Sequence, residues 1–349
     1  FDSDEAGKAG AQEVARRLGL ERCKLVTLPA KDANEYLLQG AEGYDFWEAT
    51  KEAKTLDPEE MRQSSDFIAK VKALFYPAHS DDRDPVLRLD RDLDWFEFRP
   101  GELTVWTGYN GHGKSLMLSQ VLLGLMAQGE RVMVFSGEMT PERQLKRTVK
   151  QAAGMDRPTM QYIDAIGEWI HDKQWLFNVV GSAGIDRLLT VFLYGNKRYG
   201  MRHFVIDSLM MTDVPEDGAG SMTAQKEAMR KLCDFAKRNA CHLHLVAHPR
   251  KGVDETKGPG KLDVAGSSKI TDGADNVFTV WSARKDENDP DTDPDMPDCR
   301  LELQKQRNGD TQHYKQHLWF CKQAQQFSTS SRRTPVSYVA FVQGEGFHA

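Results

Sequence analysis

The sequence lacks long hydrophobic runs. Its 349 residues include no stretch of the roughly 18 consecutive apolar residues that a membrane helix needs, and its beginning lacks a signal-peptide pattern. Cysteine is scarce, since the five cysteines are scattered, odd in number and form no C-x-x-C pair. This usage favours free thiols in a reducing compartment over disulfides or a zinc site. The sequence therefore argues against a membrane-spanning protein and against a disulfide-stabilised one.

An excess of positive charge is also missing. The formal net charge is −6, whereas nonspecific nucleic-acid binders are usually basic, so any nucleic-acid interface must be a local basic surface. Acidic residues gather in Asp286–Asp298, which is typical of a solvated loop. The length suits one large domain or two, and a first residue that is Phe rather than Met is typical of a fragment of a longer protein.

Glycine, in contrast, is concentrated just before a very apolar segment. Residues 106–120 read WTGYNGHGKSLMLSQ, and they match the pattern G-x-x-x-x-G-K-[ST]. Glycines let consecutive backbone N–H groups point into one concavity, and a helix that begins there adds its own free N–H groups. The preceding strand (103–106) and the following apolar helix (116–129) are the context that the pattern requires. The alternative is a glycine-rich turn that binds nothing.

The motif predicts a Walker A loop for ATP, or another NTP, and Mg²⁺. In this interpretation Lys114 contacts the β- and γ-phosphates and Ser115 holds the metal. The nucleotide-binding residues predicted in the loop are Gly108, Asn110, Gly111, His112, Gly113, Lys114 and Ser115.

Strands and helices alternate regularly from about residue 100. Apolar runs typical of buried strands stand within 131–139, 203–208, 241–248, 276–281 and 299–305, and helices are predicted within 140–154 and 223–240. This order predicts an α/β fold with a mainly parallel central sheet and helices on both faces. Ligands of such folds lie at the carboxyl ends of the strands, and we expect every candidate residue below to lie at that edge.

Three polar residues end predicted strands. Asp207 closes HFVID and is the expected Walker B acid, which helps to hold Mg²⁺. Glu138 ends VMVFSGE, where a carboxylate could deprotonate the attacking water. His248 ends HLHLVAH and could sense the γ-phosphate or link it to bound nucleic acid. The alternatives are a strand cap, a surface glutamate at a helix entrance and a structural histidine.

Two cations end a late strand just before an Asn-Gly turn. A guanidinium at Arg307 could stabilise transition-state charge in its own site or, as an arginine finger, on the next subunit's nucleotide. Lys305 lies two residues earlier and so shares its face of the strand. The alternative is a charged hairpin tip.

A long glycine-rich stretch follows His248. It has few aromatic residues, so tracking of a DNA backbone fits it better than base stacking. A mobile surface loop with balanced charge is the alternative. The DNA-binding residues predicted here are Arg250, Lys251, Lys261, Gly266, Ser267, Ser268 and Lys269.

Six motifs together resemble one protein family. FRPGELTVWTGYNGHGKS, VFSGEM, FVIDS, LVAHPRK, DVAGSSKITDGADNVF and LQKQRNGD occur in the order seen in ring-shaped replicative DNA helicases. The sequence is most similar to phage primase-helicases and the mitochondrial Twinkle helicase, and more distantly to bacterial DnaB-type helicases. The resemblance covers about residues 95–320.

The resemblance implies a RecA-like core that assembles as a hexameric ring around single-stranded DNA, with ATP between subunits and translocation from 5′ to 3′. It implies that Glu138 activates water, that Asp207 supports the metal and that His248 couples ATP to DNA. It also implies that Lys305 and Arg307 act in trans. For the residue that stacks on adenine, Tyr314 is the candidate.

The first forty residues resemble the end of a Toprim primase domain. FDSDEAG resembles its Asp-x-Asp metal motif, with Asp2 and Asp4 as the pair, and KDANEYL resembles its final turn. Upstream parts of such a domain are missing, so we expect no priming. The expected domains are a Toprim remnant (1–42), a helical linker that contacts a neighbouring subunit (43–92) and the ATPase (93–349). Within the linker, Leu56–Phe75 reads as one helix with Asp57 at its N-cap.

The leading hypothesis is thus a DNA helicase motor that works at a replication fork, with DNA polymerase and single-strand-binding protein as further partners and no membrane. It would act in the cytoplasm of a bacterium or phage-infected cell, or in the mitochondrial matrix. One rival is a RecA-like recombination ATPase that binds single-stranded DNA without unwinding. Another is a nucleotide-gated assembly or loading module.

Overall fold

Two units make up the chain, Phe1–Asp82 and Arg83–Ala349. The computed structural model describes residues 1–58, 61–77, 83–179, 181–215, 218–248, 268–282 and 295–340. Within them, no helix combines the length and the apolar character that crossing a membrane demands. The domain boundaries expected near residues 42 and 92 stay a prediction.

The first unit is built from short elements. Helix α1 begins after Asp4, whose carboxylate accepts a hydrogen bond from the Gly7 N–H at 2.8 Å, as an N-cap does. Two short strands pair antiparallel. The elements are α1 (Glu5–Leu18), η1 (Leu20–Arg22), β1 (Lys24–Leu25), α2 (Ala33–Leu38), α3 (Gly43–Lys51), β2 (Lys54–Thr55), η2 (Ser64–Phe67) and α4 (Ile68–Phe75).

The helix expected over Leu56–Phe75 is wrong in its first half. The carboxylate of Asp57 accepts a hydrogen bond from the Thr55 hydroxyl at 2.6 Å instead of capping a helix. Among the described residues after β2, regular structure starts at Ser64, as a 3₁₀ turn, and the α-helix α4 begins at Ile68. The sequence from 57 to 66 offers one large apolar side chain, Met61, so it has no apolar stripe that could stabilise a helix by packing.

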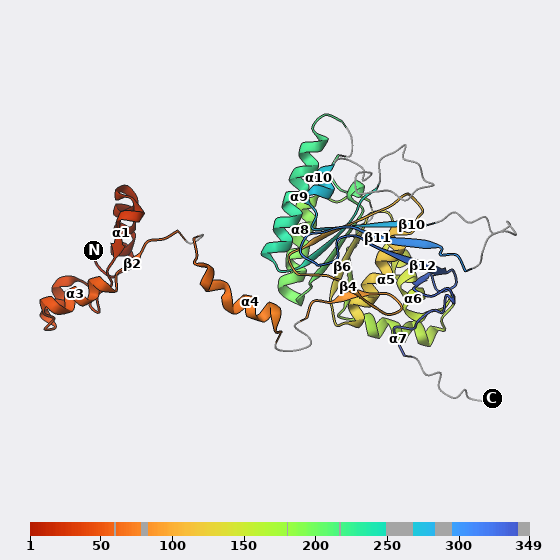
Figure 1. The fold of residues 1–349 in the computed structure, drawn as a ribbon, viewed down its shortest axis with the longest axis horizontal. Helices are drawn as coiled ribbons and strands as arrows, with labels where there is room; N and C mark the ends of the chain where they lie inside the picture. The colour runs from red at the N-terminus through yellow and green to blue at the C-terminus, as the bar shows by residue number, and fades with distance from the viewer. Residues whose placement is uncertain are drawn as a thin grey trace. The chain divides into compact units, whose positions relative to one another are not determined.

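A nine-stranded sheet organises the second unit. Figure 1 shows its strands lying among the helices of this unit. Its strand order is β13-β12-β11-β10-β5-β9-β8-β6-β7, and β3 pairs with β4 outside it. The six strands from β10 to β7 are parallel, whereas β11, β12 and β13 are antiparallel to their neighbours. The predicted α/β class with a mainly parallel sheet is therefore confirmed.

The bounds of the second unit's elements follow from the structure. The strands are β3 (Val86–Arg88), β4 (Asp92–Glu97), β5 (Leu103–Thr107), β6 (Val132–Ser136), β7 (Gln174–Leu176), β8 (His203–Asp207), β9 (His242–Val246), β10 (Asn276–Ser282), β11 (Cys299–Gln306), β12 (Tyr314–Cys321) and β13 (Gln326–Ser328). The helices are α5 (Lys114–Ala127), α6 (Pro141–Ala153), α7 (Met160–Ile170), α8 (Ile185–Tyr199), η4 (Leu209–Met211), α9 (Ser221–Arg238) and α10 (Ser268–Gly273).

Helices cover both faces of this sheet (Figure 1). One apolar cluster joins α5, α6 and α7 to alternate residues of the strands, and a second joins α8 and α9 to the residues between them. Every residue of β5, β6, β8 and β9 is buried, as in sheets packed on both sides. Since burying one large aliphatic side chain stabilises a fold by about 1.5–3 kcal/mol, these strands form a rigid base for the loops at their ends.

Three histidines are buried between β8 and β9 near the amino ends of the strands. Trp106 can only donate, so its indole N–H bonds to Nδ1 of His244 at 3.3 Å, and His244 Nε2 then donates to Nδ1 of His203 at 3.3 Å. His203 Nε2 in turn lies 3.5 Å from the Glu130 carboxylate. His242 bonds to the Arg99 carbonyl and the Thr104 hydroxyl, each at 2.8 Å.

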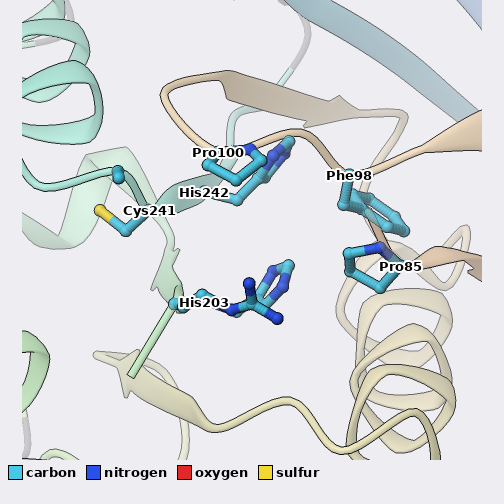
Figure 2. Close-up of a pocket in the computed structure, with 8 residues that line it drawn as sticks. Pro85, Phe98, Pro100, His203, Cys241 and His242 are labelled. Atoms are coloured by element: carbon cyan, nitrogen blue, oxygen red, sulfur yellow. The ribbon is translucent and has the colours of Figure 1, made fainter. Parts of the chain in front are cut away.

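Two of these histidines, His203 and His242, border a cavity of about 10 Å³, which is room for about one water molecule. Figure 2 shows His203 and His242 at this cavity, with Pro85, Phe98, Pro100 and Cys241 as further lining residues. Burial lowers the pKa of His242 to about 3 and holds the pKa of His244 well below its usual value. Both rings are therefore neutral at ordinary pH.

Candidate active site

The loop between β5 and α5 has the backbone that a phosphate cradle needs. It leaves β5 at Thr107 and enters α5 at Lys114, within two residues of the ends that the sequence predicts. Gly111 and Gly113 have φ values of 80° and 86°, which glycine adopts without strain. At Gly108, whose φ is 150°, a Cβ would lie 2.1 Å from the Val280 carbonyl oxygen of β10. Only glycine fits there, because the loop passes directly over the neighbouring strand.

Lys114 lies inside this loop. Its ammonium donates to the carbonyl oxygens of Gly108 at 2.7 Å and Tyr109 at 3.1 Å. Burial lowers its pKa to about 8, and the nearby charges of Asp207 and Glu138 oppose that effect. A cation held in a concavity of backbone N–H groups is suited to binding a polyphosphate.

Two other loop residues have structural partners. His112 is buried, and its Nδ1 accepts a hydrogen bond from the Ser282 N–H at 3.1 Å, which ties the loop to the end of β10. The Asn110 side-chain oxygen pairs with Nδ1 of His248 at 2.6 Å. Asn110 therefore connects the phosphate loop to the end of β9.

Asp207 ends β8 beside the first turn of α5. Burial raises its pKa to about 6, and a hydrogen bond from Ser115 opposes this rise. Its Oδ1 atom is buried without a hydrogen-bond partner among the described residues. The Ser115 hydroxyl and this carboxylate are the oxygen donors that Mg²⁺ prefers, and the described residues contain no cluster of three or more acidic, histidine or cysteine ligands. Such a site fits Mg²⁺ bound by one or two protein ligands together with phosphate oxygens.

Glu138, Ser208 and His248 form a polar chain at the same edge. Ser136 of β6 pairs in register with Asp207 of β8, so the residues that follow the two strands lie close together at this edge. The Ser208 hydroxyl donates to Glu138 Oε1 at 3.2 Å and lies 3.3 Å from His248 Nε2. The Glu138 carboxylate is half-exposed and 3.5 Å from the same histidine nitrogen. The sequence analysis did not identify Ser208, although it adjoins the expected Walker B acid.

Arg147 is a second residue that the sequence analysis missed. It lies on α6, which follows Glu138, and its charge interacts with both Asp207 and Glu138. Burial removes this guanidinium partly from water and so lowers its pKa. A partly buried cation beside two carboxylates adds to the positive charge available for phosphate. Arg143, Lys146 and Lys150 lie on the same helix, so the sequence offered no signal that singles out Arg147.

Lys305 and Arg307 lie at the opposite edge of the sheet, so the expectation that all candidates share the ligand edge is wrong. The reason is strand direction, because β11 runs antiparallel to β10 and its carboxyl end meets the amino end of the parallel strands. Arg307 bonds to Asp275, and Asp275 also accepts the N–H of Leu103, the first residue of β5. The phosphate loop leaves the other end of β5, at a distance of about 15 Å for a five-residue strand.

Tyr314 begins β12 and is partly exposed. Its ring stacks on Trp95 with centroids 4.5 Å apart and an angle of 28° between the rings. One face of Tyr314 is therefore covered by its own chain, and its role in stacking on a base stays a prediction.

The remaining candidates contribute no site geometry. Of the predicted DNA-binding residues, Arg250, Lys251, Lys261, Gly266 and Ser267 lie outside the described residues, and Ser268 and Lys269 are described only as the backbone start of α10. Asp2 lies 3.8 Å from Lys31, and Asp4 caps α1. The likeness of this segment to a Toprim domain stays a prediction.

Residues 88–329 match the family model described as the DnaB-like helicase C terminal domain. The chain is 26% identical over 310 residues to a protein of Arabidopsis thaliana named Twinkle homolog protein, chloroplastic/mitochondrial, over 82% of this chain and 43% of that protein. It is 25% identical over 307 residues to the DNA helicase/primase of Enterobacteria phage T3, over 80% of this chain and 52% of that protein. The chain thus spans about half the length of these relatives.

Two solved structures share the fold. The ATPase domain of G40P superposes with a TM-score of 0.61 at 14% identity, over 78% of this chain and 99% of that one. A DnaB-like replicative helicase, studied together with its interactions with primase, superposes with a TM-score of 0.59 at 15% identity, over 92% of this chain and 75% of that one.

Proposed function

Because this chain belongs to the DnaB-like helicase C-terminal domain family, we propose that it is the motor of an ATP-driven replicative DNA helicase. DnaB-like helicases are NTP-hydrolysing enzymes that usually use Mg²⁺. The convergence of the Lys114 loop, Asp207 and Glu138 at one edge of the sheet carries this proposal. The names of the relatives, a Twinkle homolog and a phage helicase/primase, support the replicative role.

Each residue at this edge has a chemical task in the proposed reaction. Backbone N–H groups of the loop and the Lys114 ammonium bind the β- and γ-phosphates, and Arg147 adds a second positive charge. Ser115 and Asp207 would hold Mg²⁺, which neutralises charge on the phosphates. Glu138 accepts the proton of the water that attacks the γ-phosphorus, and the diphosphate leaves in line.

The same geometry favours a shared site between protomers. Arg307 is too far from its own phosphate loop, so it can stabilise transition-state charge only on another copy's nucleotide. Helix α4 supports assembly as well, since its Leu74 and Phe75 and the adjoining Tyr76 are 75–82% exposed. Apolar side chains exposed to this degree are suited to packing on another subunit. We propose a hexameric ring.

The proposed DNA contact lies beyond β9. His248 is linked through Ser208 to Glu138, the proposed general base. A DNA strand bound by the residues that follow His248 could therefore change the position of the Glu138 carboxylate. We assign this contact to Arg250, Lys251, Lys261, Gly266, Ser267, Ser268 and Lys269. The proposal includes 5′ to 3′ translocation and work beside a polymerase and single-strand-binding protein.

Unwinding of a forked DNA duplex tests the function. The chain should separate the strands only when ATP and Mg²⁺ are present, and Lys114→Ala should abolish both hydrolysis and unwinding. Lys226→Ala, which changes an exposed lysine on α9, is the matched control and should leave both activities intact. Hydrolysis stimulated by single-stranded DNA without strand separation would instead favour a recombination or assembly ATPase. A chain that releases no phosphate would refute the proposal.

A further inference from the structure

The structure assigns Asp275 as the positioning residue for Arg307, an inference that rests on the proposed action of Arg307 on a neighbouring copy. Asp275 directly precedes β10 and is buried. Its two carboxylate oxygens have different partners. Oδ2 accepts the N–H of Leu103 at 3.0 Å, and Oδ1 pairs with Nη1 of Arg307 at 2.7 Å.

The backbone of Asp275 is fixed as firmly as its side chain. Its own N–H donates to the Leu103 carbonyl at 2.9 Å, so the residue bonds to β5 through both its main chain and its carboxylate. β5 is a central strand with every residue buried. The carboxylate that receives Arg307 is thus bound to a central, fully buried strand of the sheet.

Carbonyl oxygens at the end of α10 complete the support. Nη2 of Arg307 lies 3.4 Å from the Asp272 carbonyl and 3.5 Å from that of Ala274. Lys305 donates to the carbonyls of Thr271 at 2.9 Å and Asp272 at 3.1 Å and also to that of Ala274. Since an ammonium has three donors, these three carbonyls satisfy Lys305. We therefore place Lys305 in the support, with Arg307 as the group presented outward.

The turn after Arg307 is held from its other side. Asn308 donates to Glu102 Oε1 at 2.8 Å, and Asn276 donates to Glu102 Oε2 at 2.8 Å. Glu102 is buried and directly precedes β5. The carboxylates of Asp275 and Glu102 thus hold this region from two sides, and both lie next to the amino end of β5.

This support matters because an arginine on a hairpin tip is otherwise mobile. The Arg307 side chain is 43% exposed, whereas that of Asp275 is 3% exposed. A free arginine side chain loses on the order of 2 kcal/mol of rotamer freedom when it is fixed, and displacement of a catalytic group by about 1 Å can cost about 100-fold in rate. Asp275 fixes the guanidinium before the neighbouring copy arrives, so hydrolysis does not bear that entropy loss.

Asp275→Asn in the full chain tests this assignment. The oxygen of the asparagine amide can still accept the Leu103 N–H. The neutral amide cannot form the ion pair with Arg307, so this pair is lost. We expect kcat for ATP hydrolysis to fall about 10- to 100-fold with nucleotide affinity unchanged. Asp164→Asn, an exposed aspartate on α7, is the control and should keep full activity.

Mixing experiments then separate positioning from a general structural role. Asp275→Asn keeps its own phosphate loop, so adding Lys114→Ala protein, whose Arg307 is intact, should restore hydrolysis. Adding Arg307→Ala protein instead should restore none, because neither partner offers a placed arginine. A purely structural defect in Asp275→Asn would give no recovery with either partner, and it would overturn the inference. Hydrolysis by Asp275→Asn at the unmodified rate would overturn it too.

A second variant covers the case in which Asp275→Asn does not fold. Asn308→Ala removes only the bond from an exposed side chain to Glu102, and it should give a smaller loss of kcat that Lys114→Ala protein again restores. Full activity of Asn308→Ala, or a loss that is not restored, would then count against the positioning role. The parallel mixture of Arg307→Ala with Lys114→Ala tests the proposed function itself. If that mixture shows no recovery, trans action fails, whatever Asp275 does.

Discussion

Acid should destabilise the sheet through its buried histidines. His242 and His244 are neutral in the folded protein, because burial lowers the pKa of His242 to about 3 and that of His244 well below its usual value. In the unfolded chain each has a pKa of about 6.5. Below that pH the unfolded state binds protons that the folded state excludes, so the free energy of unfolding falls as the pH falls. At pH 5 each histidine accounts for a loss of about 2 kcal/mol, or about 4 kcal/mol for both.

One group at the active site opposes this trend. Burial raises the pKa of Asp207 to about 6, above its unfolded value of 3.8, so the folded state takes up this proton first. Between pH 7 and pH 5 this effect adds about 1.4 kcal/mol to the free energy of unfolding. The expected net change from pH 7 to pH 5 is therefore a loss of about 2–3 kcal/mol.

Urea unfolding at a series of pH values measures this slope, with hydrogen exchange of the amides in β8 and β9 as the local readout. His242→Gln should roughly halve the histidine contribution to the slope, whatever it does to the stability at pH 7. His171→Gln, at a histidine that is 77% exposed, is the matched control and should leave the slope unchanged. A free energy of unfolding that stays constant or rises from pH 7 to pH 5 would refute the reasoning, as would an unchanged slope in His242→Gln.

Three substitutions near the nucleotide site have distinct expected results. Gly108→Ala places a Cβ against the Val280 carbonyl, so thermal unfolding should shift down by several degrees and nucleotide binding should be lost; an unchanged midpoint would contradict the close approach. Ser208→Ala should lower kcat for hydrolysis about tenfold without changing nucleotide affinity, because the Glu138 carboxylate loses a hydrogen bond, and Ser208→Thr should retain activity. Arg147→Ala should weaken binding of ATP about 10- to 100-fold more than binding of ADP in calorimetry, since a bond to a charged group contributes about 1.5–3 kcal/mol; equal losses would place Arg147 away from the γ-phosphate.

The parts of the fold that the sequence predicted are those with long apolar runs. The predictions of the buried strands and of helix α5 agree with the structure. These elements are packed on all sides, so nearly every side chain must be apolar, and the sequence shows this directly. The helix expected from Leu56 fails for the opposite reason. An N-cap residue at Asp57 does not suffice where Met61 is the one large apolar side chain between residues 57 and 66, whereas Ile68–Phe75 is rich in apolar residues and is helical.

The candidate site was predictable where chemistry follows one strand directly. To predict that Lys114, Asp207 and Glu138 lie close together, it was enough to know that each follows a parallel strand of the same sheet. The position of Arg307 required the direction of β11, which no local pattern shows. Asp275 was missed because its role depends on Leu103 and Arg307, which are far from it in sequence.

Strand β5 has a consequence for any assembly of this chain. Five residues separate the loop that would hold one nucleotide from the carboxylate that orients the arginine offered to the next. The spacing between successive reaction centres would then be set by a short, inextensible rod inside each copy. Insertion of two residues into that rod would displace the guanidinium by about 7 Å, so its length should tolerate no change even where its composition does.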